Sequence, residues 1–168
     1  MPTRLTLILL ACLAVVPAAL AAPSATGDGV FELKDVDASK IIITGTRGAI
    51  WGQLDSGTLK VTDMNLDDGI APQVSGAEST QSTADPGVKI YSGKNIHFRF
   101  SGGKYKFTIV GSTGVDVTAV GVGQVWLTGD PYSFDPGDYA IDDGKWQPVP
   151  LVKKFLTFGV QPVVPATP

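Results

Sequence analysis

The chain has 168 residues, with 13 basic and 16 acidic side chains that give a formal net charge of −3. A net negative charge gives no case for nucleic-acid binding, which depends on a basic surface. The chain has one cysteine and one histidine, which are too few ligands for most zinc sites. Thiol-based catalysis with a histidine base would have only this one pair of residues.

The first 21 residues have the pattern of a secretory signal peptide. Arg4 supplies a positive start, residues 5–16 form an apolar run, and residues 19–21 (Ala-Leu-Ala) form a small-x-small cleavage site. Cleavage after Ala21 removes Cys12 and leaves 168 − 21 = 147 residues, with no later apolar run of the ~18 residues that a membrane span needs. We therefore expect a bacterial protein that is secreted or associated with the cell envelope, with neither a cysteine nor a transmembrane segment in its mature form.

After a loose stretch at residues 22–29, we expect one all-β domain over residues 30–160. Short β-prone runs are separated by many of the 20 glycines and 12 prolines, and no segment has a helical period. This pattern is typical of an antiparallel β-sandwich or β-roll of roughly ten short strands. The alternative is a β-solenoid, because residues 48–51 (Gly-Ala-Ile-Trp) and 123–126 (Gly-Gln-Val-Trp) are alike.

The strongest pattern lies at residues 95–110, where apolar and polar side chains alternate on both sides of Gly102 and Gly103. Two adjacent glycines favour a two-residue hairpin loop. We therefore predict a hairpin with its apolar side chains on one face and its polar side chains on the other. The predicted partners are Ser101 with Lys104, Phe100 with Tyr105, Phe98 with Phe107 and Ile96 with Ile109. The polar face holds His97, Arg99, Lys106 and Thr108.

Three other segments are predicted from their composition. Residues 66–84 are polar and aperiodic, which indicates a long surface loop or a disordered one. Residues 141–146 contain Asp-Gly and favour a second hairpin, with Asp142 facing Lys145. Residues 161–168 contain three prolines and are expected to form an extended tail.

The residue types favour neither a metal site nor an active site. Asp135, Asp138 and Asp142 could offer oxygen ligands to Ca²⁺, but no EF-hand or nonapeptide pattern is present and aspartate is an ordinary turn residue. His97 has no carboxylate near it in the sequence, and a Gly-x-Ser-x-Gly motif is missing. We therefore predict a protein that is not an enzyme and that uses no cofactor.

Basic side chains gather in one part of the chain. Residues 88–110 contain five lysines and arginines and no acid, whereas residues 111–143 contain six aspartates and no base. A solvated face is the simpler interpretation of such a run. The functional interpretation is an anionic partner, either a cell-envelope polymer or phospholipid headgroups. Its binding residues would be Lys89, Lys94, His97, Arg99 and Lys106.

Carbohydrate is the alternative ligand, because flat aromatic side chains can stack on sugar rings. The candidate residues are Trp51, Trp126, Trp146 and Tyr132. A glycoside hydrolase would also need two suitably spaced carboxylates. A groove with an exposed tryptophan and paired acids would favour this alternative, and aromatic side chains buried between two sheets would favour a structural role.

The segments Tyr91–Phe100 and Gly114–Gly121 resemble parts of uncharacterised secreted bacterial proteins, particularly from actinobacteria, with a likeness that extends over about residues 43–158. Those proteins have no established activity, cofactor or catalytic residue, so the resemblance implies only an exported β-rich domain. The sequence therefore predicts a non-catalytic binding or structural module that is extracellular or attached to the envelope. The alternative is a sugar-binding module or a carboxylate-dependent glycoside hydrolase.

Overall fold

The computed structural model describes residues 28–142 and 144–159. The predicted signal peptide, with its cysteine, and the predicted proline-rich tail lie outside these residues. None of the described segments forms a helix long and apolar enough to cross a membrane.

The described residues contain eight β-strands and one short 3-10 helix, η1 (Leu66–Asp68). Every strand pairing is antiparallel, and the strands form one sheet in the order β2-β4-β1-β5-β8, with β3 paired to β4, β6 to β1 and β7 to β6. The all-β, antiparallel class is therefore confirmed. The strands are β1 (Gly29–Asp63), β2 (Gln73–Ser75), β3 (Ser79–Ser82), β4 (Val88–Ser101), β5 (Tyr105–Gly129), β6 (Asp138–Ile141), β7 (Gln147–Pro148) and β8 (Lys154–Phe158).

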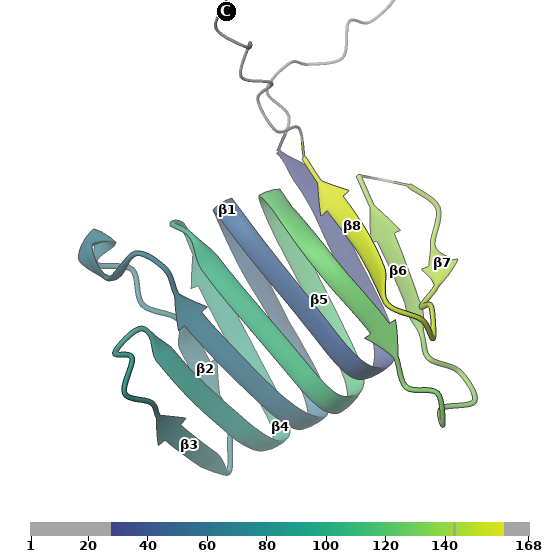
Figure 1. Ribbon diagram of the computed structural model, residues 1–168, viewed down its shortest axis with the longest axis horizontal. Helices are drawn as coiled ribbons and strands as arrows, with labels where there is room; N and C mark the ends of the chain where they lie inside the picture. The colour runs from purple at the N-terminus through teal and green to yellow at the C-terminus, as the bar shows by residue number, and fades with distance from the viewer. Residues whose placement is uncertain (1–27, 143, 160–168) are drawn as a thin grey trace, which may run out of the picture.

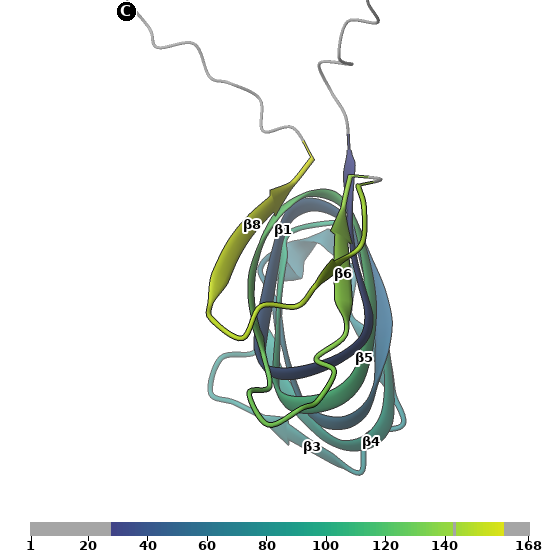
Figure 2. The ribbon, with the colours of Figure 1, turned by 90° about the vertical axis from the view of Figure 1, so that its right-hand side faces the viewer.

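Strands β1 and β5 are 35 and 25 residues long, and they wind around the core as a flattened coil (Figures 1 and 2). Because of this winding, β1 meets β5 on both of its edges, and Ile43 pairs with both Phe107 and Val125. The coil has two layers that face each other. The first layer contains residues 29–36 and 47–54 of β1, 115–121 of β5 and 95–101 of β4, with β2 and β6. The second layer contains residues 40–45 and 58–63 of β1, 105–110 and 123–129 of β5 and 88–92 of β4, with β3 and β8.

Fewer strands are present than the sequence predicted, because several predicted strands are parts of one. The β-prone runs at residues 30–36, 40–44, 48–54 and 58–64 were expected as separate strands, and all but Met64 lie within β1. Gly48 and Gly57 have φ values of +122° and +137° and lie within this strand, so they do not end it. The two Gly-x-x-Trp segments lie on β1 and β5, which pair antiparallel, so they are not parallel rungs of a solenoid.

The predicted hairpin at Gly102 and Gly103 is wrong in its pairing. Strands β4 and β5 do not pair with each other, because β1 lies between them in both layers. The turn crosses from the first layer to the second, and both glycines have positive φ, as a tight reversal requires. The two predicted aromatic contacts, Phe98 with Phe107 and Phe100 with Tyr105, therefore form across the core instead of along one sheet face.

The predicted direction of these side chains is confirmed. Ile96, Phe98, Phe100, Tyr105, Phe107 and Ile109 are all buried. The ring centroids of Phe98 and Phe107 are 5.2 Å apart, and those of Phe100 and Tyr105 are 5.6 Å apart. Burial raises the pKa of the Tyr105 hydroxyl well above its usual value. The two layers thus share one aromatic core.

Residues 66–84 differ from the predicted loop. They contain η1 and two short strands, β2 and β3, which pair with the free edge of β4. Most of their side chains are exposed and polar, so main-chain hydrogen bonds with β4 hold them and no apolar alternation reveals them. Only a few side chains, among them Ile70 and Val74, pack against the core.

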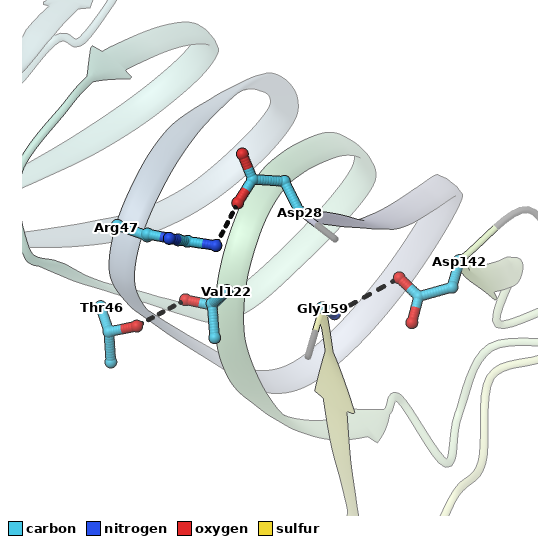
Figure 3. A network of polar contacts seen from close by, with 6 residues as sticks. All are labelled: Asp28, Thr46, Arg47, Val122, Asp142 and Gly159. Atoms are coloured by element: carbon cyan, nitrogen blue, oxygen red, sulfur yellow. Dashed lines mark hydrogen bonds and ion pairs between the residues drawn. The ribbon is translucent and has the colours of Figure 1, made fainter. Parts of the chain in front are cut away.

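The second predicted hairpin forms, but its register is shifted by one residue. Tyr139 of β6 pairs with Gln147 of β7, whereas the predicted register would place it opposite Pro148. The Oδ1 atom of Asp142 accepts hydrogen bonds from the N–H groups of Val30, at 2.9 Å, and Gly159, at 3.4 Å. Figure 3 shows Asp142 and Gly159 at the end of the coil where β1 begins, near the exposed ion pair of Arg47 and Asp28. Asp142 therefore joins the start of β1 to the end of β8.

Candidate functional site

A groove lies on the outer surface of the first layer. It runs across the strands, between two rows of outward side chains. The first row, the Trp51 wall, consists of Thr118, Trp51, Arg99 and Gln73 from four neighbouring strand segments. The second row, the Gln53 wall, consists of Asp116, Gln53, His97 and Ser75 from the same four segments.

The groove consists of two hollows that share His97, Phe98 and Arg99. Their volumes are about 660 Å³ and 280 Å³. The floor runs from Leu33 to Val74, and it crosses five strand segments. At about 4.8 Å per strand, four spacings give a groove about 19 Å long. An extended polymer or a short oligomer fits this shape better than a compact ligand.

The floor is formed mainly by main chain, because the residues between the two walls point into the core. Gly52 lies at the centre of this floor, between Val117 of β5 and Phe98 of β4. A Cβ atom on Gly52 would lie 2.2 Å from the main-chain oxygen of Asp116 and 3.0 Å from the ring of Phe98. Glycine is therefore required here for the close packing of β1 on its two neighbours.

Asp116 and Gln53 form a fixed polar pair on one wall. The Nε2 atom of Gln53 donates a hydrogen bond to Oδ2 of Asp116 at 3.1 Å, and the N–H group of Asp35 donates to Oδ1 at 2.8 Å. Asp35 has a φ of +50°, an uncommon value for a residue other than glycine. The carboxylate thus holds both the Gln53 side chain and the bend of β1 in place.

Trp51 and Arg99 lie directly opposite each other in the register of β1 and β4. Directly opposed residues in antiparallel strands have Cβ atoms about 5 Å apart, so the indole and the guanidinium group are neighbours on one wall. Trp51 is 42% exposed, and no aromatic ring or cation within the described residues stacks on it. Its ring is available to a ligand.

The five predicted anion-binding residues do not form one surface. His97 and Arg99 lie on opposite walls of the groove, in the first layer. Lys106 points outward from the second layer, where its partners are Thr44 and Thr62. Lys89 lines a separate small hollow, and Lys94 lies at the bend of β4, opposite Ser56. The predicted hairpin would have placed Arg99 opposite Lys106, and this placement is wrong because β4 and β5 do not pair.

The four predicted stacking residues also lie apart. Trp126 lies on the second layer, where Phe155 packs 4.5 Å from its ring and the Lys153 ammonium lies 4.0 Å from the ring centroid. Tyr132 and Trp146 lie in the segments between β5 and β6 and between β6 and β7, with exposed fractions of 95% and 47%. Trp51 is the member of this set that lines the groove.

Of the three candidate calcium ligands, Asp135 and Asp138 line one hollow, and Asp142 lies beside the start of β1. Asp142 accepts the two main-chain hydrogen bonds described above, and Asp135 accepts one from the N–H group of Gly137 at 3.1 Å. Asp138 pairs with Pro148 in the second hairpin. Over residues 28–142 and 144–159, no group of three or more acidic, histidine or cysteine side chains is arranged to hold a metal ion.

Comparisons with protein families, with curated proteins and with solved structures find no match for this chain. The groove itself therefore carries the functional argument. Sequence reasoning named Trp51, His97 and Arg99 separately but missed Gln53, Asp116 and Thr118. Alternation shows that these three side chains point outward, but only the pairing of β1 with both β4 and β5 brings them together.

Proposed function

We propose that this chain is a secreted β-roll domain that binds an extended polysaccharide in the groove and does not cleave it. The observation that carries the proposal is the exposed ring of Trp51 in an open groove, flanked by hydrogen-bonding side chains. Sugar rings present apolar faces that stack on aromatic side chains, and their hydroxyl groups pair with amides, carboxylates and guanidinium groups. Secretion and attachment to the envelope rest on the leader pattern in the sequence.

Binding without cleavage is favoured by the carboxylates of the groove. Glycoside hydrolysis commonly needs two carboxylates on either side of the scissile bond. Glu32 lies outside the two hollows of the groove, beside Thr118 at the end of the Trp51 wall. Among the described residues that line the two hollows, Asp116 is the one carboxylate, and both of its oxygens accept hydrogen bonds from the protein. This arrangement suits a residue that orients Gln53 and accepts a sugar hydroxyl at its edge.

Attachment to an anionic surface through a broad basic face has less support. Its five candidate residues divide between two layers and one bend of the sheet. A flat charged membrane or polymer cannot touch all of them at once, so the attraction would be weak and easily screened by salt.

Affinity electrophoresis of the purified protein in gels that contain soluble neutral and acidic polysaccharides tests the proposal. We expect at least one polysaccharide to retard the protein. Trp51→Ala should abolish this retardation, because the stacking surface is lost, and the matched control Trp126→Ala should retain it. Migration that no polysaccharide changes, or equal retardation of the Trp51→Ala variant, would contradict the proposal. Release of reducing ends would contradict binding without cleavage.

A further inference from the structure

We infer that the groove selects an acidic polysaccharide, with a sugar ring stacked on Trp51 and its carboxylate bound by Arg99. This inference rests on the proposed function and adds the chemical class of the ligand. It places the negative charge of the ligand at the β4 end of the groove, where Arg99 and His97 lie on opposite walls.

In the described part of the chain, the guanidinium group of Arg99 has no carboxylate partner. Within the described residues its side chain forms neither an ion pair nor a hydrogen bond, and the one ion pair present there joins Arg47 to Asp28. Its neighbours along the wall are Trp51 and Gln73, which carry no charge. A guanidinium group offers five N–H donors in a planar fork that matches a carboxylate.

The neighbouring positions give Arg99 no carboxylate of the protein either. Two residues away along the strands, the outward side chains next to Arg99 are His97 and Ser101 on β4, Ala49 and Gln53 on β1, and Ser75 on β2. None of these is acidic. Arg99 is exposed, so its guanidinium group is open to a carboxylate that a ligand brings.

The acid of the groove, Asp116, lies on the opposite wall and two strands away, with Gln53 between it and His97. Its two oxygens already accept protein hydrogen bonds. Among the residues that line the groove, the arginine thus lies at β4 and the carboxylate at β5. A sugar on Trp51 would place its carboxylate toward β4 and its hydroxyl groups toward β5.

The shape of the site favours a carboxylate on a sugar over a lipid headgroup. The cation sits beside an aromatic ring within a groove about 19 Å long, across four strand spacings of about 4.8 Å each. A bilayer surface cannot enter such a groove, whereas a single polysaccharide chain can lie along it. Arginine beside an indole provides stacking and bidentate pairing to the same sugar unit.

The test is affinity electrophoresis against polygalacturonate and against its carboxyl-reduced form, which keeps the linkage and loses the charge. Dextran and dextran sulfate form a second pair that differs in sulfate. We expect dissociation constants about tenfold lower for polygalacturonate than for its reduced form, as one charge-assisted hydrogen-bonded pair would give. Arg99→Gln should remove this preference, because it weakens the binding of polygalacturonate far more than that of the reduced polymer.

Two further variants distinguish the bidentate geometry of the Arg99 guanidinium group from the effect of positive charge alone. Arg99→Lys should keep only part of the preference, because lysine cannot form the bidentate pair. Lys106→Gln removes one charge from the second layer and should change the preference by less than about twofold, since exposed charges beyond a Debye length are screened.

Each contrary result has a distinct meaning. Equal binding of charged and reduced polymers would overturn the selection of an acidic sugar and leave the proposed function intact. Binding of dextran sulfate but of neither galacturonate polymer would replace the carboxylate with a sulfate ester and overturn the inference. An equal loss of preference in the Lys106→Gln and Arg99→Gln variants would assign it to net charge. Failure of every polysaccharide to bind would overturn the proposed function as well.

Discussion

The two outer faces of the coil are formed by the same strands, but the tryptophan on each face has different neighbours. On the first layer, Trp51 lines a groove beside Arg99, and no aromatic ring or cation of the described residues stacks on it. On the second layer, Phe155 and Lys153 pack against the ring of Trp126. Exposure alone does not distinguish these residues, since Trp51 is 42% and Trp126 is 38% exposed. The neighbours that the fold supplies decide which ring can take a ligand.

The charges on the two faces follow the same division. Lys40, Lys60 and Lys106 are exposed and point outward from the second layer, among threonines. The groove instead places one arginine and one aspartate at different points along its length. Uniform charge gives an attraction without orientation, whereas separated charges can orient a ligand.

The largest expected effect tests whether the two faces depend on one core. Phe107 comes from the second layer, and its ring contacts Phe98 and Phe100 of the first. We expect Phe107→Ala to lower the free energy of unfolding by about 3–5 kcal/mol, because a fully buried aromatic side chain leaves a cavity. Urea denaturation measures this loss, and Phe134→Ala, at a fully exposed position, is the control. Loss of one layer with the other intact would show that the faces are independent.

The next effect concerns alkaline pH. Burial raises the pKa of Tyr105 above the value of about 10 that tyrosine has in an unfolded chain. The unfolded state therefore loses this proton first, and Tyr105 stabilises the fold fully below pH ~10 and less as the pH rises above it. We expect this contribution to fall by up to about 1.4 kcal/mol per pH unit in that range.

Denaturation midpoints of the wild-type protein and the Tyr105→Phe variant, measured from pH 8 to 11.5, isolate this effect. Their difference should be constant below pH ~9 and should shift in favour of the variant above pH ~10. Tyr132→Phe removes a hydroxyl from an exposed ring and should leave the curve unchanged. A constant difference between the wild-type protein and Tyr105→Phe at all pH values would mean that Tyr105 reaches solvent in the native state.

The smallest effect sharpens the contrast between the two tryptophans. Trp126→Ala removes contacts with Phe155 and Lys153, and we expect it to lower the free energy of unfolding by about 1–2 kcal/mol. Trp51 makes no such contacts with the described residues, so we expect Trp51→Ala to change the free energy of unfolding by no more than about 0.5 kcal/mol. Thermal denaturation of both variants gives the comparison. A greater loss of stability for Trp51→Ala would identify Trp51 as a packing residue instead of a ligand-binding one.

The sequence predicted side-chain direction well and strand neighbours poorly. The alternation at residues 95–110 placed six core residues correctly, including Phe98 and Tyr105, because strand geometry turns successive side chains to opposite faces. The same alternation fits a hairpin and a turn between layers equally well. Both structures bury the same residues, so the pattern could not show that β1 lies between β4 and β5.

The candidate site shows the same limit. Trp51, His97 and Arg99 could be found as outward polar or aromatic residues in β-prone runs. Gln53 and Asp116 had no local signal, because their sequence separation of 63 residues hides a hydrogen bond between neighbouring strands. The strands β2 and β3 were missed for a related reason, since main-chain pairing with β4 holds them.

By itself, the sequence determined that this chain is all-β in its described part and that the six alternating apolar side chains of residues 95–110 enter the core, since both follow from local periodicity. The tertiary structure decided which strands are neighbours, and with them the groove, the division of the basic residues and the different settings of Trp51 and Trp126. The physical reason is that strand direction is a property of adjacent residues, whereas pairing is settled by the packing of segments far apart in the chain.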